Sequence, residues 1–303
     1  MKVLIIGGVA AGTKVAAKLK RENFDYEVAI LTKSKDISYA GCGLPYYVGK
    51  VISDRSQLIV NSPDSFSNLT GVQILTEVEV TKVSPVEKTV DALDLKTNLT
   101  NSYKYDKLVI ASGASAIIPP VDGVNLKNVF FMRTPDDAVA LREAVESGDI
   151  KRAVVVGGGY IGLEVAENIS SLGVRVSVID MAKHIAPGFD EEFSETKLEA
   201  ILGEEKVEKI QTNKRAIKAD AVILSVGIRA NTDFLMDTGI ELMPNKTIKV
   251  NEFLQTNIED IYAVGDCTTV INRLTKEPVW SPMGSTANIA GRVAAKNIAG
   301  ANI

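Results

Sequence analysis

The sequence predicts an α/β protein made of two doubly wound domains, each built around a parallel sheet. An internal repeat is the first observation, because VLIIGGVAAGTKVAAKL at 3–19 aligns without a gap with AVVVGGGYIGLEVAENI at 153–169. Each copy opens with apolar residues typical of a strand buried on both faces, and then passes through glycines into a helical pattern. Second strands follow at similar distances, at 27–32 and 174–180. The repeat therefore predicts two Rossmann-like β-α-β units.

The remaining elements follow the same design along the chain. Strand-like runs occur at 72–83, 107–113, 219–227 and 257–267, and a closing helix is predicted at 285–300. The Pro-rich stretch IIPPVDG after the second of these runs is typical of a domain boundary. We therefore predict a first domain at 1–115 and 245–303, discontinuous in sequence, with a second domain at 116–244 inserted into it.

Composition excludes several classes of partner. The 303 residues carry a formal charge of −4 and only two cysteines. An acidic balance gives no reason to expect binding to nucleic acid or to an anionic membrane, and two cysteines indicate a reducing compartment rather than a disulfide scaffold. Glycines and basic residues interrupt the apolar N-terminus, which argues against a signal peptide. We expect a cytoplasmic protein with no metal site and no membrane-spanning segment.

The second glycine-rich turn is complete. Gly157, Gly159 and Gly162 form GxGxxG between a strand and a helix, where backbone N–H groups at the helix start can face a pyrophosphate. Asp180 ends the next predicted strand, where a carboxylate accepts hydrogen bonds from a ribose 2′-OH and repels a 2′-phosphate. This favours NADH over NADPH. The alternative is a solvated carboxylate at a strand end, softened by the nearby Lys183.

The first glycine-rich turn departs from the pattern. Gly7 and Gly12 are present, but Val9 occupies the position of the middle glycine, and Thr32 stands where the ribose-binding acid is expected. A dinucleotide can still bind if Gly8 relieves the crowding and Thr32 offers its hydroxyl.

Cys42 lies between two glycines in SYAGCGLPYYVG at 38–49. A lone cysteine is more often a small buried hydrophobe than a nucleophile, and Cys267 is expected to be one. Around Cys42, however, the glycines and Pro45 favour a thiol at a helix N-terminus, where the dipole stabilises a thiolate. No second cysteine lies near it.

These motifs together resemble the FAD-dependent pyridine nucleotide-disulfide oxidoreductases, within them the single-cysteine branch of coenzyme A disulfide reductase. The resemblance rests on GGVAAG, SYAGCGLPYYVG, ASG, GGGYIGLE, AVGDC and GSTANIAGR. It implies a glutathione-reductase-like fold with FAD in the first domain, a nicotinamide cofactor in the second, and Cys42 beside the flavin. NADH is expected, with NADPH possible. Members normally continue into a C-terminal dimerisation domain, which we expect this chain to lack, so that a homodimer would require a longer chain.

Two sets of residues are expected to bind ligands. The cofactor-binding positions are Gly7, Gly8, Ala11, Gly12, Thr32, Lys33, Val80, Ser112, Gly113, Gly157, Gly159, Tyr160, Ile161, Gly162, Glu164, Asp180, Gly227, Gly265 and Asp266. By the resemblance, Asp266 contacts the ribityl and phosphate portion of FAD, Tyr160 is a gate and Glu164 a flavin-side acid. Packing on the helix face is the alternative for Tyr160, and a surface acid is the alternative for Glu164.

A basic helix face is the candidate substrate site. Lys14, Lys18 and Arg21 recur at i, i+4 and i+7, so they share one face. Cations there suit the phosphates of coenzyme A, and the resemblance adds Ser38 to them. The alternative is an ordinary solvated face. Gly41 stands where the family often has an asparagine that contacts the substrate, which leaves the identity of the disulfide open.

Three functions stay open at this point. The first is a reductase in which NADH reduces FAD, FAD reduces Cys42, and the thiolate attacks a small disulfide, most simply that of coenzyme A, or a persulfide. The second is an NADH oxidase or peroxidase that cycles Cys42 through sulfenic acid. Related oxidases have a histidine where this chain has Ala10, and the only histidine is His184. The third is a flavoprotein that passes electrons to a protein partner.

Overall fold

The computed structural model describes residues 1–182, 195–301 and 303, so Lys183 and His184 lie outside the described residues. The chain divides into two compact units. Unit 1 comprises Met1–Tyr39, Ile59–Ser115 and Arg229–Ile303, and unit 2 comprises Ala40–Leu58 and Ala116–Ile228. The sequence analysis assigned 40–58 to the first domain and 229–244 to the second. Whether each unit is the binding domain of one cofactor stays a prediction.

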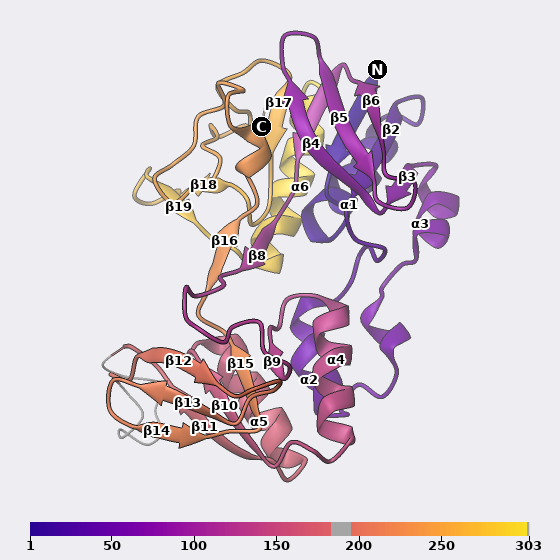
Figure 1. Cartoon of the computed structure of the whole chain (residues 1–303). Helices are drawn as coiled ribbons and strands as arrows, with labels where there is room; N and C mark the ends of the chain where they lie inside the picture. The colour runs from indigo at the N-terminus through magenta and orange to yellow at the C-terminus, as the bar shows by residue number, and fades with distance from the viewer. Residues whose placement is uncertain (183–194, 302) are drawn as a thin grey trace. The chain divides into compact units, whose positions relative to one another are not determined.

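Unit 1 is built on a five-stranded parallel sheet in the order β17-β7-β1-β2-β3, of which β2, β3 and β17 are labelled in Figure 1. Its strands are β1 (Lys2–Ile6), β2 (Glu27–Thr32), β3 (Gln73–Thr76), β7 (Lys107–Ile110) and β17 (Ile261–Ala263). The helices of this unit are α1 (Ala10–Glu22), α3 (Pro63–Thr70) and α6 (Gly284–Ile298). The remaining strands form a three-stranded antiparallel sheet, β4 (Val78–Ser84), β5 (Thr89–Asp94) and β6 (Leu99–Lys104), and a pair, β18 (Thr269–Ile271) and β19 (Pro278–Trp280).

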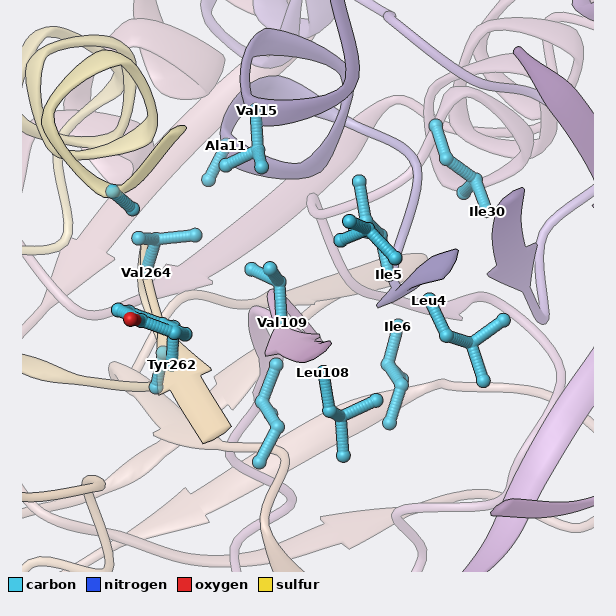
Figure 2. Packing of buried hydrophobic residues seen from close by; sticks show 14 of the residues in the cluster. Leu4, Ile5, Ile6, Ala11, Val15, Ile30, Leu108, Val109, Tyr262 and Val264 are labelled. Atoms are coloured by element: carbon cyan, nitrogen blue, oxygen red, sulfur yellow. The ribbon is translucent and has the colours of Figure 1, made fainter. Parts of the chain in front are cut away.

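The core of unit 1 explains why β1 reads as an unbroken apolar run. Leu4, Ile5, Leu108 and Val109 have no exposed surface. Figure 2 shows Ile5 and Val109 pointing toward α1 while Leu4 and Leu108 point to the opposite face. Because successive side chains of a strand alternate in direction, a strand covered on both faces must be apolar at every position.

Unit 2 repeats this plan with a four-stranded parallel sheet in the order β11-β10-β15-β9 (Figure 1). Its strands are β9 (Val129–Phe130), β10 (Arg152–Val156), β11 (Arg175–Ile179) and β15 (Ala221–Leu224). The helices are α2 (Leu44–Val48), α4 (Pro135–Glu146) and α5 (Tyr160–Ser171). The short strands β8 (Ala114–Ala116) and β16 (Ile228–Ala230), at which the chain passes from one unit to the other, pair with each other. Two doubly wound parallel sheets are thus present, as the repeat predicted.

In its described part, unit 2 forms an antiparallel sheet of β12 (Leu198–Leu202), β13 (Lys209–Thr212) and β14 (Ala216–Lys218). Strand β13 pairs antiparallel with both of its neighbours. None of the described helices is both long enough and apolar enough to cross a membrane.

Candidate active site

The two glycine-rich turns have the same construction. Gly7 and Gly157 adopt φ angles of +104° and +106°, in the left-handed region where a side chain would be strained. Their N–H groups donate to Leu31 O and Ile179 O, both at 2.8 Å. These two carbonyls belong to β2 and β11, so each turn is tied to the second strand of its own β-α-β unit.

Each turn also requires its last glycine. A Cβ on Gly12 would lie 1.9 Å from the carbonyl oxygen of Gly7, and one on Gly162 would lie 2.0 Å from that of Gly157. No side chain fits at such distances, so α1 and α5 can begin this close to their strands only with glycine. The internal repeat therefore reflects two equivalent backbone geometries.

The two turns differ at the middle position of the motif, which is Gly159 in the second turn and Val9 in the first. Gly159 is exposed, and a Cβ built on it would meet none of the described atoms within 4 Å. Gly159 is the N-cap of the 12-residue helix α5 and has no side chain to accept a hydrogen bond. Among the described residues, no capping side chain therefore accepts from the first N–H groups of α5. An open space beside a helix N-terminus fits the pyrophosphate of a dinucleotide. In the first turn Val9 caps α1, again with no side-chain hydrogen bond from the described residues.

Asp180 follows β11 directly and lies against the second turn. Its Oδ2 accepts a hydrogen bond from Gly158 N at 2.6 Å, and its Oδ1 accepts one from Ala182 N at 2.7 Å. The carboxylate is therefore held at the end of the strand, beside the open space at Gly159. The contacts show that it is more than a freely solvated acid, while its role toward a ribose stays a prediction.

Besides Gly162, three predicted residues lie on the first turns of α5. Tyr160 is 92% exposed and Ile161 is 39% exposed. Packing of Tyr160 on the helix face, the alternative interpretation, does not apply. Glu164 is half-buried, one turn further along the same helix. Gly227, after β15, has a φ of +108°, and a Cβ built on it would lie 3.4 Å from the Ile117 side chain.

The residues expected around the other dinucleotide gather in unit 1 at the ends of β2, β7 and β17. Thr32 is only 5% exposed, and a Cβ built on Gly8 would lie 3.4 Å from Thr32 Cβ, so the threonine side chain lies beneath the turn. Lys33 pairs with Glu79 at 2.8 Å. Val80, on β4, is 9% exposed.

A second group joins the end of β7 to the loop after β16. Ser112 Oγ donates to Asn231 O at 2.7 Å, and Asn231 Nδ2 donates to Ser112 O at 3.0 Å. Asn231 N also donates to Gly113 O at 3.0 Å. Asn231 was missed by the sequence analysis, because its partners lie 119 residues away and no local pattern marks it.

The AVGDC motif lies next to the first turn. A Cβ built on Gly265 would lie 2.9 Å from Ala11 Cβ, so this loop touches the start of α1. The backbone oxygen of Asp266 accepts a hydrogen bond from the Trp280 indole at 2.9 Å. Gly7, Ala11 and Gly265 are therefore brought together in one place, as a dinucleotide site at this turn requires.

The basic face of α1 is less free than the sequence suggests. Lys18 pairs with Glu22 one turn further along, and its side chain is 23% exposed. The stem of Lys14 lies against Gly291 of α6, and the guanidinium of Arg21 donates to Ala17 O at 3.1 Å. Ser38 has an unusual φ of +50°, and its N–H donates to Gly8 O at 3.0 Å.

The two cysteines differ in exposure. Cys42 is exposed and lies in a 3₁₀ turn, Gly41–Gly43, directly before α2. Cys267 has no exposed surface, its Sγ lies 3.4 Å from Val264 O, and burial raises the pKa of its thiol. The expectation that Cys267 is a buried hydrophobe is confirmed. One thiol of the pair can therefore meet a substrate.

A family model described as pyridine nucleotide-disulphide oxidoreductase matches residues 1–281. The chain belongs to this family. Members of the pyridine nucleotide-disulphide oxidoreductase family use FAD and NAD(P)H, which are therefore the cofactors of this chain. The expected resemblance is thus confirmed at the level of the family and its cofactors.

Curated relatives in this family carry different names. An NADH oxidase of Methanocaldococcus jannaschii is 36% identical over 317 residues, covering 99% of this chain and 70% of the relative. An NAD(P)H coenzyme A polysulfide/persulfide reductase of Pyrococcus horikoshii is 35% identical with the same coverage. A coenzyme A disulfide reductase of Staphylococcus haemolyticus is 30% identical, again over 99% and 70%. The family thus includes both reductases and oxidases at similar distance.

Solved structures agree on the fold. The reduced CoADR-RHD protein of Bacillus anthracis superposes with a TM-score of 0.93 at 32% identity, over 99% of this chain and 57% of that one. An NAD-dependent persulfide reductase from A. fulgidus gives 0.93 at 31% identity, over 99% and 59%. This chain therefore spans less than two thirds of the length of these two proteins.

Proposed function

We propose that this protein is a reductase in which NADH, by way of FAD, supplies electrons to Cys42, which reduces a small disulfide or persulfide. Coenzyme A disulfide is the proposed substrate. The observation that carries the proposal is the difference in exposure between the two cysteines: Cys42 is exposed, whereas Cys267 is fully buried. Because Cys42 has no exposed protein thiol to pair with among the described residues, the second sulfur of its disulfide must come from the substrate.

The chemistry balances with a single thiol. Bound NADH and FAD together supply an electron pair to sulfur. The Cys42 thiolate attacks one sulfur of the substrate, the substrate S–S bond breaks, and the leaving thiolate takes a proton. Two electrons and a second proton then release the other substrate thiol and restore Cys42. The turns at Gly7 and Gly157 are the proposed holders of FAD and NADH, respectively.

Substitution of Cys42 by Ser tests this function. The variant should keep its flavin and its NADH-dependent flavin reduction but lose disulfide turnover by at least about a hundredfold, since a hydroxyl neither attacks disulfides nor ionises at neutral pH. Cys267→Ser is the matched control for losing a sulfur, judged by disulfide turnover alone. Retained turnover in the Cys42 variant would exclude the mechanism, and loss of flavin would point to a packing role.

An NADH oxidase is the second candidate, favoured by the name of the M. jannaschii relative. Ala10, the first residue of α1, argues against it, because an alanine cannot hydrogen-bond a sulfenic acid as the histidine of related oxidases does. An intact mass of the isolated protein separates the two. A coenzyme A mixed disulfide on Cys42 supports the reductase, and a single added oxygen supports the oxidase.

A further inference from the structure

The chain around Cys42, Ala40–Leu58, is called the Cys42 segment below. It belongs to unit 2 by its contacts. Within that unit α2 packs on both α4 and α5 (Figure 1). Gly49, which caps α2, lies so close to α5 that a Cβ on it would be 2.0 Å from Asn168 Oδ1. The helix that follows the thiol is therefore seated on the helix that begins at the second glycine-rich turn.

One side chain of α4 holds the far end of this segment. Arg142 Nη1 donates to the backbone oxygens of Tyr47, Ile52 and Ser53, at 3.3, 3.2 and 3.0 Å. The Arg142 guanidinium also lies 4.4 Å from the centroid of the Tyr47 ring. Its side chain is only 15% exposed, so these contacts are made largely out of water.

Neighbouring charges fix the guanidinium in turn. Arg142 Nε contacts Glu146 Oε1 at 3.2 Å, and the same oxygen contacts Lys50 Nζ, which belongs to the Cys42 segment, at 2.9 Å. At the other end of α4, Arg55 pairs with Asp136 at 3.2 Å. The segment is thus tied to α4 at three points after the thiol.

These contacts suit the end of a short helix. Of the three carbonyls, that of Tyr47 belongs to the last turn of α2, and those of Ile52 and Ser53 lie in the loop after it. The last carbonyls of a helix lack partners within it, and a cation near them interacts favourably with the helix dipole. A five-residue helix has little stability of its own, so its position depends on such tertiary contacts. All three carbonyls share the two N–H groups of Nη1, while the contact of Nε with Glu146 fixes the orientation of the guanidinium; a lysine keeps the charge but has no second nitrogen to fix its direction.

We propose that Arg142 is a positioning residue for Cys42. By holding α2 and the loop after it against α4, Arg142 sets where the Gly41–Gly43 turn begins and hence where the thiol is presented. The residue does not touch the thiol. This inference rests on the proposed function, because it assumes that Cys42 is the redox thiol.

The test compares Arg142→Met and Arg142→Lys in the FAD-loaded protein. We expect Arg142→Met to lower kcat for disulfide reduction about tenfold, because three carbonyls lose a charged donor, with a smaller loss for Arg142→Lys. The rate of flavin reduction by NADH and the KM for NADH should stay within about twofold of wild type, since α5 is unchanged. Arg175→Met removes an exposed arginine of the same unit and should leave every one of these values unchanged.

A second measurement tests directly the contacts by which Arg142 holds the Cys42 segment on α4, which are called the clamp below. Hydrogen exchange of the peptide covering 43–53 should be about tenfold faster in Arg142→Met, while peptides of β10 keep their wild-type rates. Wild-type kcat in both variants, or an equal loss of flavin reduction and disulfide turnover, overturns the inference. Failure of the proposed function is distinguished by Cys42→Ser. If that variant keeps disulfide turnover, the thiol is not the redox group, whatever the exchange of 43–53 shows.

Discussion

Alanine at Gly162 and at Gly159 should separate packing from cofactor binding within one motif. At Gly162 the new methyl group would lie 2.0 Å from the Gly157 oxygen, where ordinary contact begins at 3.4 Å, so α5 and the turn at Gly157 must move apart by about 1.4 Å. Overpacking of this kind costs about 1–3 kcal/mol. For a unit of this size we expect a melting temperature lower by about 3–9 °C, together with impaired use of NADH.

At Gly159 the same methyl group enters open space. The backbone there, with φ −77° and ψ 179°, is one that alanine adopts, but glycine is preferred over alanine at a helix N-cap, so the change should cost about 0.5–1 kcal/mol. If a pyrophosphate approaches this backbone, however, the methyl group displaces it. We expect the KM for NADH to rise about tenfold, equivalent to about 1.4 kcal/mol, with the melting temperature lowered by only about 1–3 °C.

Thermal unfolding followed by circular dichroism gives the melting temperature, and anaerobic titration of the rate of flavin reduction with NADH gives the KM, on the same preparations. Each variant serves as the control for the other, since both add one methyl group to α5 or its cap. An unchanged KM in Gly159→Ala would show that no cofactor approaches this turn. A fully stable Gly162→Ala would contradict the packing on which the repeat rests.

Three further predictions concern charged side chains. The flavin of the wild-type protein should be reduced by NADH well before NADPH, and Asp180→Ala should lower that preference about tenfold in the same titration. Equal use of NADH and NADPH by wild type would show that Asp180 does not select between them. Lys18→Glu should raise the KM for coenzyme A disulfide about two- to fivefold at low salt and leave the KM for a small uncharged disulfide unchanged. An unchanged KM for coenzyme A disulfide would mean that the basic face of α1 does not bind the substrate. Burial alone would raise the pKa of Asp260, but hydrogen bonds from Lys107 and Lys88 hold it below its usual range. The stability that the Asp260 carboxylate contributes is therefore present above about pH 4 and lost as pH falls through the lowered pKa. On acidification below about pH 4, the urea midpoint of unfolding should fall further in wild type than in Asp260→Asn.

The sequence predicted those parts of the fold that local pattern controls. The run EVAILT at 27–32 coincides with β2, and the closing helix, predicted at 285–300, is α6 at Gly284–Ile298. The gapless repeat correctly predicted two equivalent β-α-β units, because Gly7 and Gly157 adopt the same left-handed backbone geometry, which favours glycine at both positions.

Contacts between distant segments were not predictable in this way. The Cys42 segment looks continuous with the first repeat, yet its partners Arg142 and Asn168 lie about a hundred residues further on and form no motif with it. Thr32 was expected to offer a hydroxyl, and its 5% exposure follows from packing beneath Gly8 that no pattern reveals. The Lys18–Glu22 pair was readable, because the two residues are spaced i, i+4.

The clamp on the Cys42 segment has a consequence for the order of synthesis. Arg142 leaves the ribosome one hundred residues after Cys42, which at about 5–20 residues per second is a delay of about 5–20 s. During that interval neither α4 nor α5 exists, so α2 has nothing to pack on. The nascent chain therefore carries an exposed thiol on an unsupported segment, and oxidants can reach this sulfur before the protein has formed the surface that holds it.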